Sequence, residues 1–244
     1  MEQQQQRPVV QRVRHELRRR ELVVASVTPL GEHFVSVTFA GDDLADFVSL
    51  GFDDHVKFML SDAAGEPVRR DYTPRRYDAQ SRQLTIEFAL HGHGAASDWA
   101  RHAAPGQSAT IGGPRGSMIV PFDFDWHLLV ADATGLPAIR RRLEELPAST
   151  RVMVVALVDA RDRILPETRA QLELHWADDA DALVAAVRAL TLPDGEGYAW
   201  GGGEAAMMKR VRDVLANEKA LPKEAMRMSA YWKLGAADFH EDLG

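Results

Sequence analysis

The sequence predicts two structural parts in succession, an antiparallel β-barrel or sandwich followed by a parallel α/β domain. Between about residues 18 and 120, short stretches of alternating β-branched and polar residues are separated by Gly, Pro and Asp turns, a pattern typical of an all-β unit. From about residue 125, apolar runs alternate with stretches of helical period, which indicates a parallel sheet covered by helices. Pro114, Gly116 and Pro121 cluster between the two patterns and mark the boundary.

The all-β part is preceded by a segment of different composition. Residues 1–17 combine a short glutamine run with many arginines, and we expect this segment to be flexible. Its basic stretch is either helical or simply solvated. The strands of the all-β part are expected within residues 22–41 (a strand, a turn and a second strand), 54–60, 69–78, 83–90 and 107–113.

The α/β part shows both helical spacing and buried strands. Apolar residues between 136 and 146 recur at helical intervals directly after an apolar strand. The uninterrupted apolar run 151–158 predicts a strand that is buried on both faces. Asp181 is the predicted N-cap of the next helix. Strands are expected at 126–132, 151–158, 172–176, 197–200 and 225–235, and helices at 133–146, 179–190 and 204–218.

Composition excludes several classes of function. The chain has 244 residues, a net charge of −7 and no cysteine. The acidic balance argues against a nucleic-acid binder. The lack of cysteine excludes disulfides, thiolate metal sites, cysteine-bound iron–sulfur clusters and a thiol nucleophile, so any redox chemistry needs an organic cofactor. No apolar run is long enough to span a membrane, and the first twenty residues have no secretory h-region, so we expect a cytoplasmic protein.

The stretch RRDYTPRRYD, residues 69–78, is the first candidate site. Arg70 and Tyr72 are two positions apart on a strand and therefore face the same side. Arginine offers a fork of donors to a pyrophosphate, tyrosine stacks on a flavin ring, and Thr73 offers a hydrogen bond. A barrel followed by a nucleotide-type domain is one way to bring a flavin to a nicotinamide. The alternative is an exposed edge strand decorated with arginines.

The stretch HGHGAASDWA, residues 91–100, is the second candidate site. Glycines and small residues here open a helix, and backbone amides at such a position bind anions. One alternative is a plain strand end followed by a helix with Ser97 as its cap. Another is a metal site at His91 and His93, for which Asp53, Asp54 and His55 are further candidate ligands, although none of them stands at a telling spacing.

Seven stretches, taken in order, resemble the siderophore-interacting protein family of flavin-dependent ferric-siderophore reductases, which are related to ferredoxin–NADP reductases. The resemblance covers nearly the whole chain. It implies an FAD-binding Greek-key β-barrel over residues 18–122 and an NAD(P)H-binding-like α/β domain over residues 123–244. The stretches are DHVKFML, RDYTPRRYD, HGHGAASDWA, GGPRGS, LLVADATGLPAIRRRLEELP, YAWGGGEAAMMKRVRDVL and YWKLGAADFHED.

The resemblance also assigns roles to residues. It implies a flavin motif and a loop for the pyrophosphate and the adenine side of FAD. The family usually has proline where this chain has Ala95 or Ala96, which loosens the loop but leaves its amides available. The flavin motif comprises Arg70, Tyr72, Thr73 and, at its far end, Arg75; the loop comprises His91, Gly92, Gly94, Ala95, Ala96, Ser97 and Trp99.

The electron donor is expected on the α/β side of the flavin. By resemblance, Thr134 and the turn Gly202–Gly203–Glu204 lie near a nicotinamide. No G-x-G-x-x-G follows the first strand of this part, so donation by NAD(P)H depends on the resemblance and not on a phosphate-binding motif. NADH, NADPH and ferredoxin all stay open as donors.

The acceptor implied by the resemblance is Fe(III) held in a siderophore, whose reduction to Fe(II) releases the iron. Some ferric chelates are strongly anionic, and a chain of net charge −7 repels them unless a local basic patch overrides the average field. Lys57, Arg76 and Lys233, together with Arg75, are the predicted basic pocket. Each of these taken singly is also consistent with a solvated surface charge.

Other functions fit the sequence less well. Ser117 lacks the strand–G-x-S-x-G–helix context of a hydrolase nucleophile. A non-enzymatic flavin or siderophore carrier has no need of a second domain for a donor. A flavin oxidoreductase acting on another metal chelate or small acceptor is the remaining alternative. For a ferric-siderophore reductase, no resident metal ion and no obligatory general acid are expected.

Overall fold

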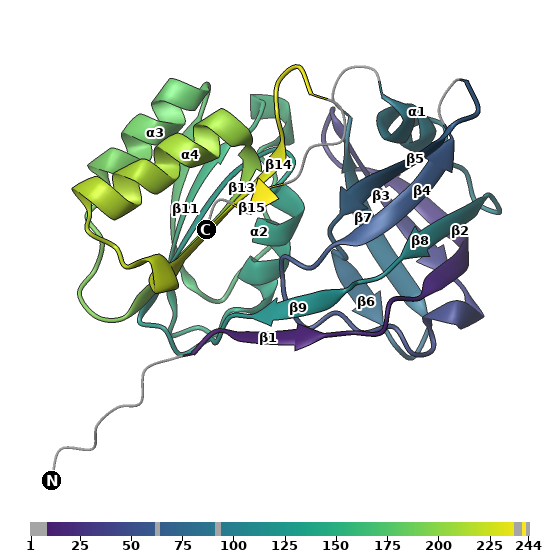
Figure 1. The fold of residues 1–244 in the computed structure, drawn as a ribbon, viewed down its shortest axis with the longest axis horizontal. Helices are drawn as coiled ribbons and strands as arrows, with labels where there is room; N and C mark the ends of the chain where they lie inside the picture. The colour runs from purple at the N-terminus through teal and green to yellow at the C-terminus, as the bar shows by residue number, and fades with distance from the viewer. Residues whose placement is uncertain (1–8, 62–63, 91–93, 237–240, 243–244) are drawn as a thin grey trace, which may run out of the picture.

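The computed structural model describes residues 9–61, 64–90, 94–236 and 241–242. Figure 1 shows two parts side by side, a curled antiparallel sheet formed by the first half of the chain and an α/β part formed by the second. The strands form one seven-stranded, one six-stranded and one two-stranded sheet. The predicted fold class is therefore confirmed. In the described part of the chain, no helix is long and apolar enough to cross a membrane.

The antiparallel sheet has the order β5-β4-β8-β2-β3-β7-β6 and curls into an open barrel (Figure 1). Phenylalanines that alternate inward along its strands fill the interior, with Phe39, Phe58 and Phe88 fully buried. Helix α1 (Ala95–Arg101) lies over one end. The strands are β2 (Arg19–Pro29), β3 (Phe34–Ala40), β4 (Val56–Ser61), β5 (Pro67–Tyr72), β6 (Arg76–Asp78), β7 (Gln83–Ala89) and β8 (Ser108–Gly112).

Part of the N-terminal segment differs from its prediction as a flexible, helical or solvated stretch. Gln11–Arg14 form strand β1, which pairs antiparallel with β9 (Gly116–Ile119). The side chain of Ser117, on β9, is buried, and its hydroxyl donates a hydrogen bond to Asp54 Oδ2 at 2.6 Å. His15 Nε2 lies 2.8 Å from the same hydroxyl. The serine is thus a buried link between strand and loop, which agrees with the expectation that it is no nucleophile.

The parallel sheet has the order β12-β11-β10-β13-β14-β15, with only β15 antiparallel. Alternate residues of its strands face opposite cores, one under α2 (Leu136–Glu145) and one under α3 (Ala180–Ala189) and α4 (Ala205–Asp213). The cap of α3 is Asp179, which accepts a hydrogen bond from the amide of Ala182, and not Asp181 as predicted. The strands are β10 (Trp126–Asp132), β11 (Arg151–Leu157), β12 (Gln171–Ala177), β13 (Gly197–Glu204), β14 (Met226–Trp232) and β15 (Glu241–Asp242).

Helix α2 joins the two parts through successive arginines. Arg140 Nη1 donates to Glu87 Oε2 at 2.8 Å, and both side chains are almost completely buried. Arg141 Nη1 donates to the carbonyl of Pro74 and Arg142 Nη2 to the carbonyl of Val120, both at 2.9 Å. Burial lowers the pKa of Arg142 to about 10, which leaves its guanidinium charged at neutral pH. Arginines that ordinarily cover a helix with solvent-facing charge here bind the barrel.

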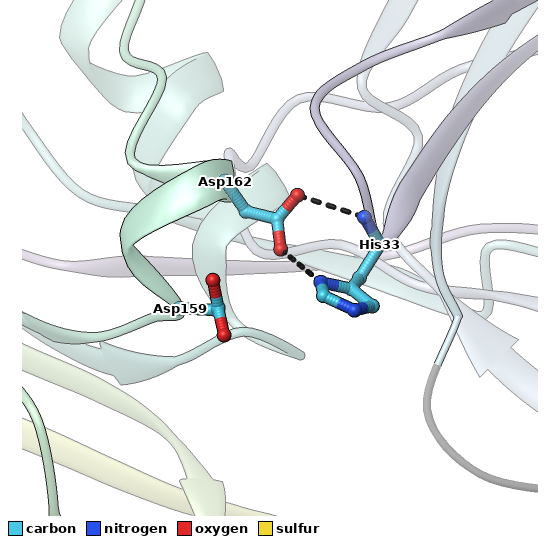
Figure 2. Close-up of side chains that lie close together, drawn as sticks. All are labelled: His33, Asp159 and Asp162. Carbon is cyan, nitrogen blue, oxygen red and sulfur yellow. Dashed lines mark hydrogen bonds and ion pairs between the residues drawn. The ribbon is translucent and has the colours of Figure 1, made fainter.

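A second contact between the parts involves the turn between β2 and β3. Figure 2 shows His33, Asp159 and Asp162, whose ligand-type atoms lie within 4.8 Å of one another. Asp162 Oδ1 accepts hydrogen bonds from the backbone amides of Glu32 and His33, and Oδ2 lies 2.7 Å from His33 Nδ1. Burial alone raises the pKa of Asp162, but these hydrogen bonds outweigh it and keep the pKa below its ordinary value. Arg161 binds Asp159. Because groups of the protein already bind both aspartates, and Asp162 binds the β2–β3 turn of the other part, we interpret the cluster as an inter-domain contact.

Candidate functional site

A cleft of about 710 Å³ lies between the barrel and the α/β part. This volume is in the usual range of small-molecule sites. Its barrel side comes from β4, β5, β7 and the start of α1, and its α/β side from the residue Thr134 after β10, the start of α2, the carboxyl end of β14 and the residues after β14. The lining residues are His55, Lys57, Pro67, Arg69, Arg70, Asp71, Tyr72, Thr73, Glu87, Ala89, Gly94, Ala95, Ala96, Ser97, Thr134, Pro137, Tyr231, Trp232 and Ala236.

The cleft lies at the topological switch point of the parallel sheet. The chain runs from β10 outward to β11 and β12, then returns to β13 on the other side of β10. In open α/β sheets, ligands bind in the crevice outside the carboxyl ends of the strands at this point. Thr134 follows β10 and lines the cleft. The position of the cleft in the sheet therefore indicates a nucleotide site, although the G-x-G-x-x-G motif is missing.

Strand β5 brings the predicted flavin motif to the barrel side. Arg70 and Tyr72 both line the cleft, and so do Arg69 and Asp71 between and beside them; Thr73 follows with 7% of its surface exposed. The ring of Tyr72 packs on Phe88 with 4.3 Å between ring centroids. Burial raises the pKa of Tyr72, so its phenol stays neutral. The guanidinium of Arg70 donates to the carbonyl of Arg69 at 2.9 Å.

The start of α1 forms one end of the cleft. Gly94 to Ser97 all line it. Among the residues that the structure describes, no side chain caps this helix at Gly94, and the first amides of a helix have no acceptor within the helix. Ser97 Oγ donates to the carbonyl of Ala89 at 3.5 Å and therefore is not the cap. The described residues do not include His91, Gly92 and His93, so the structure does not test the predicted metal site at His91 and His93.

Four of the residues predicted for the flavin or the substrate lie away from the cleft lining for identifiable reasons. β5 ends at Tyr72, and beyond Pro74 the side chain of Arg75 lies in the domain interface, where it binds Glu87 and Glu144. Arg76 binds Glu144 as well. Trp99 packs in the barrel with its ring 4.7 Å from that of Phe58. Lys233 is exposed beyond the end of β14 and is not part of the lining.

The predicted turn at the end of β13 underlies the cleft without lining it. A Cβ at Gly202 would lie 3.0 Å from the rings of Trp200 and Tyr231, and one at Gly203 would lie 2.7 Å from Asp132 Oδ2. Glu204 caps α4 by accepting a hydrogen bond from the amide of Met207. The glycines therefore let neighbouring side chains approach the backbone of β13.

The charge on the barrel side is mixed. Lys57 lines the cleft, as predicted, and its Nζ lies 2.7 Å from Asp71 Oδ2. His55, which was predicted only as an alternative metal ligand, and Arg69, which lies in the first candidate stretch but was given no role, also line it. Tyr231 and Trp232 also line the cleft. They were not predicted as site residues because the pattern of residues 225–235 indicated only the last strand of the sheet. The basic groups of the lining are therefore His55, Lys57, Arg69 and Arg70.

Comparison with known proteins gives a consistent result. A family model described as siderophore-interacting protein matches residues 124–235, and one described as siderophore-interacting FAD-binding domain matches residues 61–118. The NADPH-dependent ferric-chelate reductase of Escherichia coli is 37% identical over 91% of this chain and 96% of its own length. The ferric vibriobactin reductase ViuB of Vibrio cholerae is 29% identical over 87% of this chain and 89% of its own.

A solved structure extends the likeness to three dimensions. A siderophore utilization protein from T. fusca superimposes with a TM-score of 0.86 at 31% identity, over 95% of this chain and 98% of that one. The likeness includes both parts of the fold.

Proposed function

The chain belongs to the siderophore-interacting protein family, and we propose that it is a flavin-dependent reductase that releases iron from ferric siderophores. The observation that supports this best is the composition of one cleft. It joins a barrel wall suited to a flavin with the switch point of a parallel sheet suited to a nucleotide. A carrier has no need of the second half of this cleft.

The residues of the barrel side fit FAD. Arg70 offers a fork of donors for a pyrophosphate, and the backbone amides of Ala95 to Ser97 at the start of α1 offer a second set. A Cβ at Gly94 would meet nothing within 4 Å, so the backbone there is open to a ligand. Tyr72 supplies an aromatic surface and Thr73 a hydroxyl. We propose residues 18–122 as the FAD-binding domain and residues 123–244 as the domain for the donor.

In the proposed mechanism, the chain positions three reactants. FAD, when bound, would supply the chemistry that links hydride transfer from the donor to one-electron reduction of the acceptor. Arg70 and the α1 amides would hold its phosphates, and the neutral Tyr72 would present its ring without competing charge. Thr134, Tyr231 and Trp232 form the opposite side, where they orient the donor and exclude water. No residue of the cleft has to transfer a proton for iron reduction.

For the donor, we propose a nicotinamide nucleotide, with NADPH first because the E. coli relative is named for it. Ferredoxin, the other partner considered, has no observation in its favour. Nicotinamide nucleotides are cytoplasmic reductants, so the cytoplasm is the compartment we propose. The test is an absorption spectrum of the purified protein followed by anaerobic addition of NADPH and NADH separately. We expect a flavin spectrum that NADPH bleaches. A colourless protein that also fails to bind added FAD would overturn the proposal.

Replacing Gly94 with aspartate tests the anion site directly. Gly94 has an extended backbone with φ −174°, which any residue adopts, and its Cβ meets no neighbour. Aspartate there would cap α1 but repel a phosphate by about 1 kcal/mol, so FAD should bind several-fold more weakly while the melting temperature holds or rises. Gly94→Asn caps the helix without charge and is the matched control. Equal FAD affinity for both variants would exclude a phosphate at α1.

Replacing Lys57 with glutamate tests the charge preference for the acceptor. We expect the KM for an anionic ferric chelate to rise about fivefold, since reversing a charge near the cleft costs about 1 kcal/mol of attraction. The wild-type rate with that chelate should fall as salt increases. Lys233→Glu makes the same charge change outside the lining and is the control. An equal effect of Lys57→Glu on neutral chelates would contradict a role in charge recognition.

A further inference from the structure

Asp132 accepts four hydrogen bonds although only 7% of its surface is exposed. Its Oδ1 accepts from the amide of Thr134 at 2.8 Å and from the hydroxyl of the same residue at 2.5 Å. Its Oδ2 accepts from the amide of Glu204 and from the indole Nε1 of Trp232, both at 2.8 Å. Both oxygens are thus bound by donors alone, an arrangement that only an ionised carboxylate satisfies completely.

These four bonds join three adjacent strands at the switch point. Asp132 is the last residue of β10, Glu204 the last residue of β13 and Trp232 the last residue of β14. The sheet order places β13 between the other two. A side chain at Gly203 would collide with the carboxylate, with 2.7 Å between its Cβ and Oδ2. The glycine-rich end of β13 therefore makes room for this contact.

Asp132 is not part of the cleft lining, but both of its side-chain partners are. Thr134 and Trp232 lie 98 residues apart in the sequence, and the carboxylate holds them to one point. The indole of Trp232 is 39% exposed and would have freedom to rotate without this bond. We propose that Asp132 is the positioning residue for the donor site: it fixes Thr134 and Trp232 as one surface for the nicotinamide nucleotide. This rests on the proposed function.

Asp132→Asn is the direct test, with NADP⁺ as the probe. The NH₂ group of an asparagine would face one of the two pairs of donors, and an NH₂ group cannot accept their hydrogen bonds. The variant therefore releases at least one of the two side chains, Thr134 or Trp232. We expect the Kd for NADP⁺, measured by calorimetry without turnover, to rise about tenfold. FAD content should stay that of the wild type because the barrel side holds the flavin. The KM for NADPH should rise far more than kcat falls.

Trp232→Phe separates positioning from loss of the aromatic ring. It keeps a ring but removes the N–H, and we expect it to weaken NADP⁺ binding as well. If Asp132→Asn releases Trp232, the double variant should bind about as weakly as Asp132→Asn alone, since both changes then break the same contact; if it releases Thr134 instead, the two effects should add. Asp53→Asn is the control, because Asp53 also binds an indole, that of Trp200, but lies outside the lining. It should lower stability and leave NADP⁺ affinity unchanged.

A spectroscopic measurement on the protein without nucleotide tests the Asp132 contacts separately from the proposed function. The chain has five tryptophans, and Trp232→Phe identifies the indole N–H signal of Trp232 by NMR. In Asp132→Asn this signal or the Thr134 amide signal should shift. If neither shifts, or if they shift while NADP⁺ affinity is retained, the positioning role is overturned. If wild-type protein binds FAD but not NADP⁺, the nucleotide-donor part of the proposed function fails, and the positioning inference fails with it.

Discussion

Replacing Glu87 with glutamine is expected to lower the free energy of unfolding by about 3–5 kcal/mol, the usual cost of leaving a buried charge without its partner. Glu87 accepts from Arg140 at 2.8 Å and lies 3.1 Å from Arg75 Nε. All three side chains are at most 7% exposed. Glutamine keeps the shape and removes the charge, so Arg140 is left in the domain interface without a counter-ion. Urea unfolding of the flavin-free protein measures the effect.

An exposed ion pair provides the control for Glu87. Asp42 binds Arg82, and its side chain is 95% exposed. Asp42→Asn should cost less than about 1 kcal/mol because solvent screens such pairs. A loss for Glu87→Gln as small as that of the control would show that the α2 arginines contribute little to joining the two parts.

Replacing Arg70 with alanine should weaken FAD binding at least tenfold. A hydrogen bond to a charged group is worth about 1.5–3 kcal/mol, and each 1.4 kcal/mol is a factor of ten in affinity. Arg70 lines the cleft from the central part of β5 and is not buried in the domain interface, so the fold should tolerate the change. Equilibrium titration of the flavin-free variant with FAD gives the affinity.

Arg70→Lys distinguishes charge from geometry. Lysine keeps the positive charge but lacks the planar fork that binds two phosphate oxygens at once. We expect an affinity between those of the wild type and the alanine variant. If the alanine variant purifies with full flavin content, the assignment of Arg70 is wrong.

Local patterns in the sequence predicted most of the fold. The apolar run 126–132 became β10 with the same bounds, and the predicted strand within 69–78 became β5, whose Arg70 and Tyr72 line the cleft together with their neighbours. Both signals depend only on neighbouring residues, because strand period and burial are read within one segment. The strand that carries the flavin motif could therefore be predicted from the sequence, but the cleft that it faces could not.

Contacts between distant segments account for what was missed. Arg75 was expected at the flavin, but Glu144, 69 residues further along, binds it in the interface. Burial raises the pKa of Glu144, yet hydrogen bonds from Arg75 and Arg76 bring it down to about 2, so this carboxylate stays charged. Strand β1 depends on β9, more than a hundred residues away. Asp132 gave no signal in the sequence because its partner Trp232 lies 100 residues downstream.

The most direct measurement of the central claim follows electrons to iron. The FAD-loaded protein would be reduced anaerobically with one equivalent of NADPH and then mixed with a ferric catecholate chelate, with an Fe(II)-specific dye present. We predict that the oxidised flavin spectrum returns and that about two Fe(II) form per flavin, since a reduced flavin holds two electrons and each Fe(III) accepts one. A flavin that stays reduced in the presence of the chelate, with no Fe(II) formed, would contradict the account.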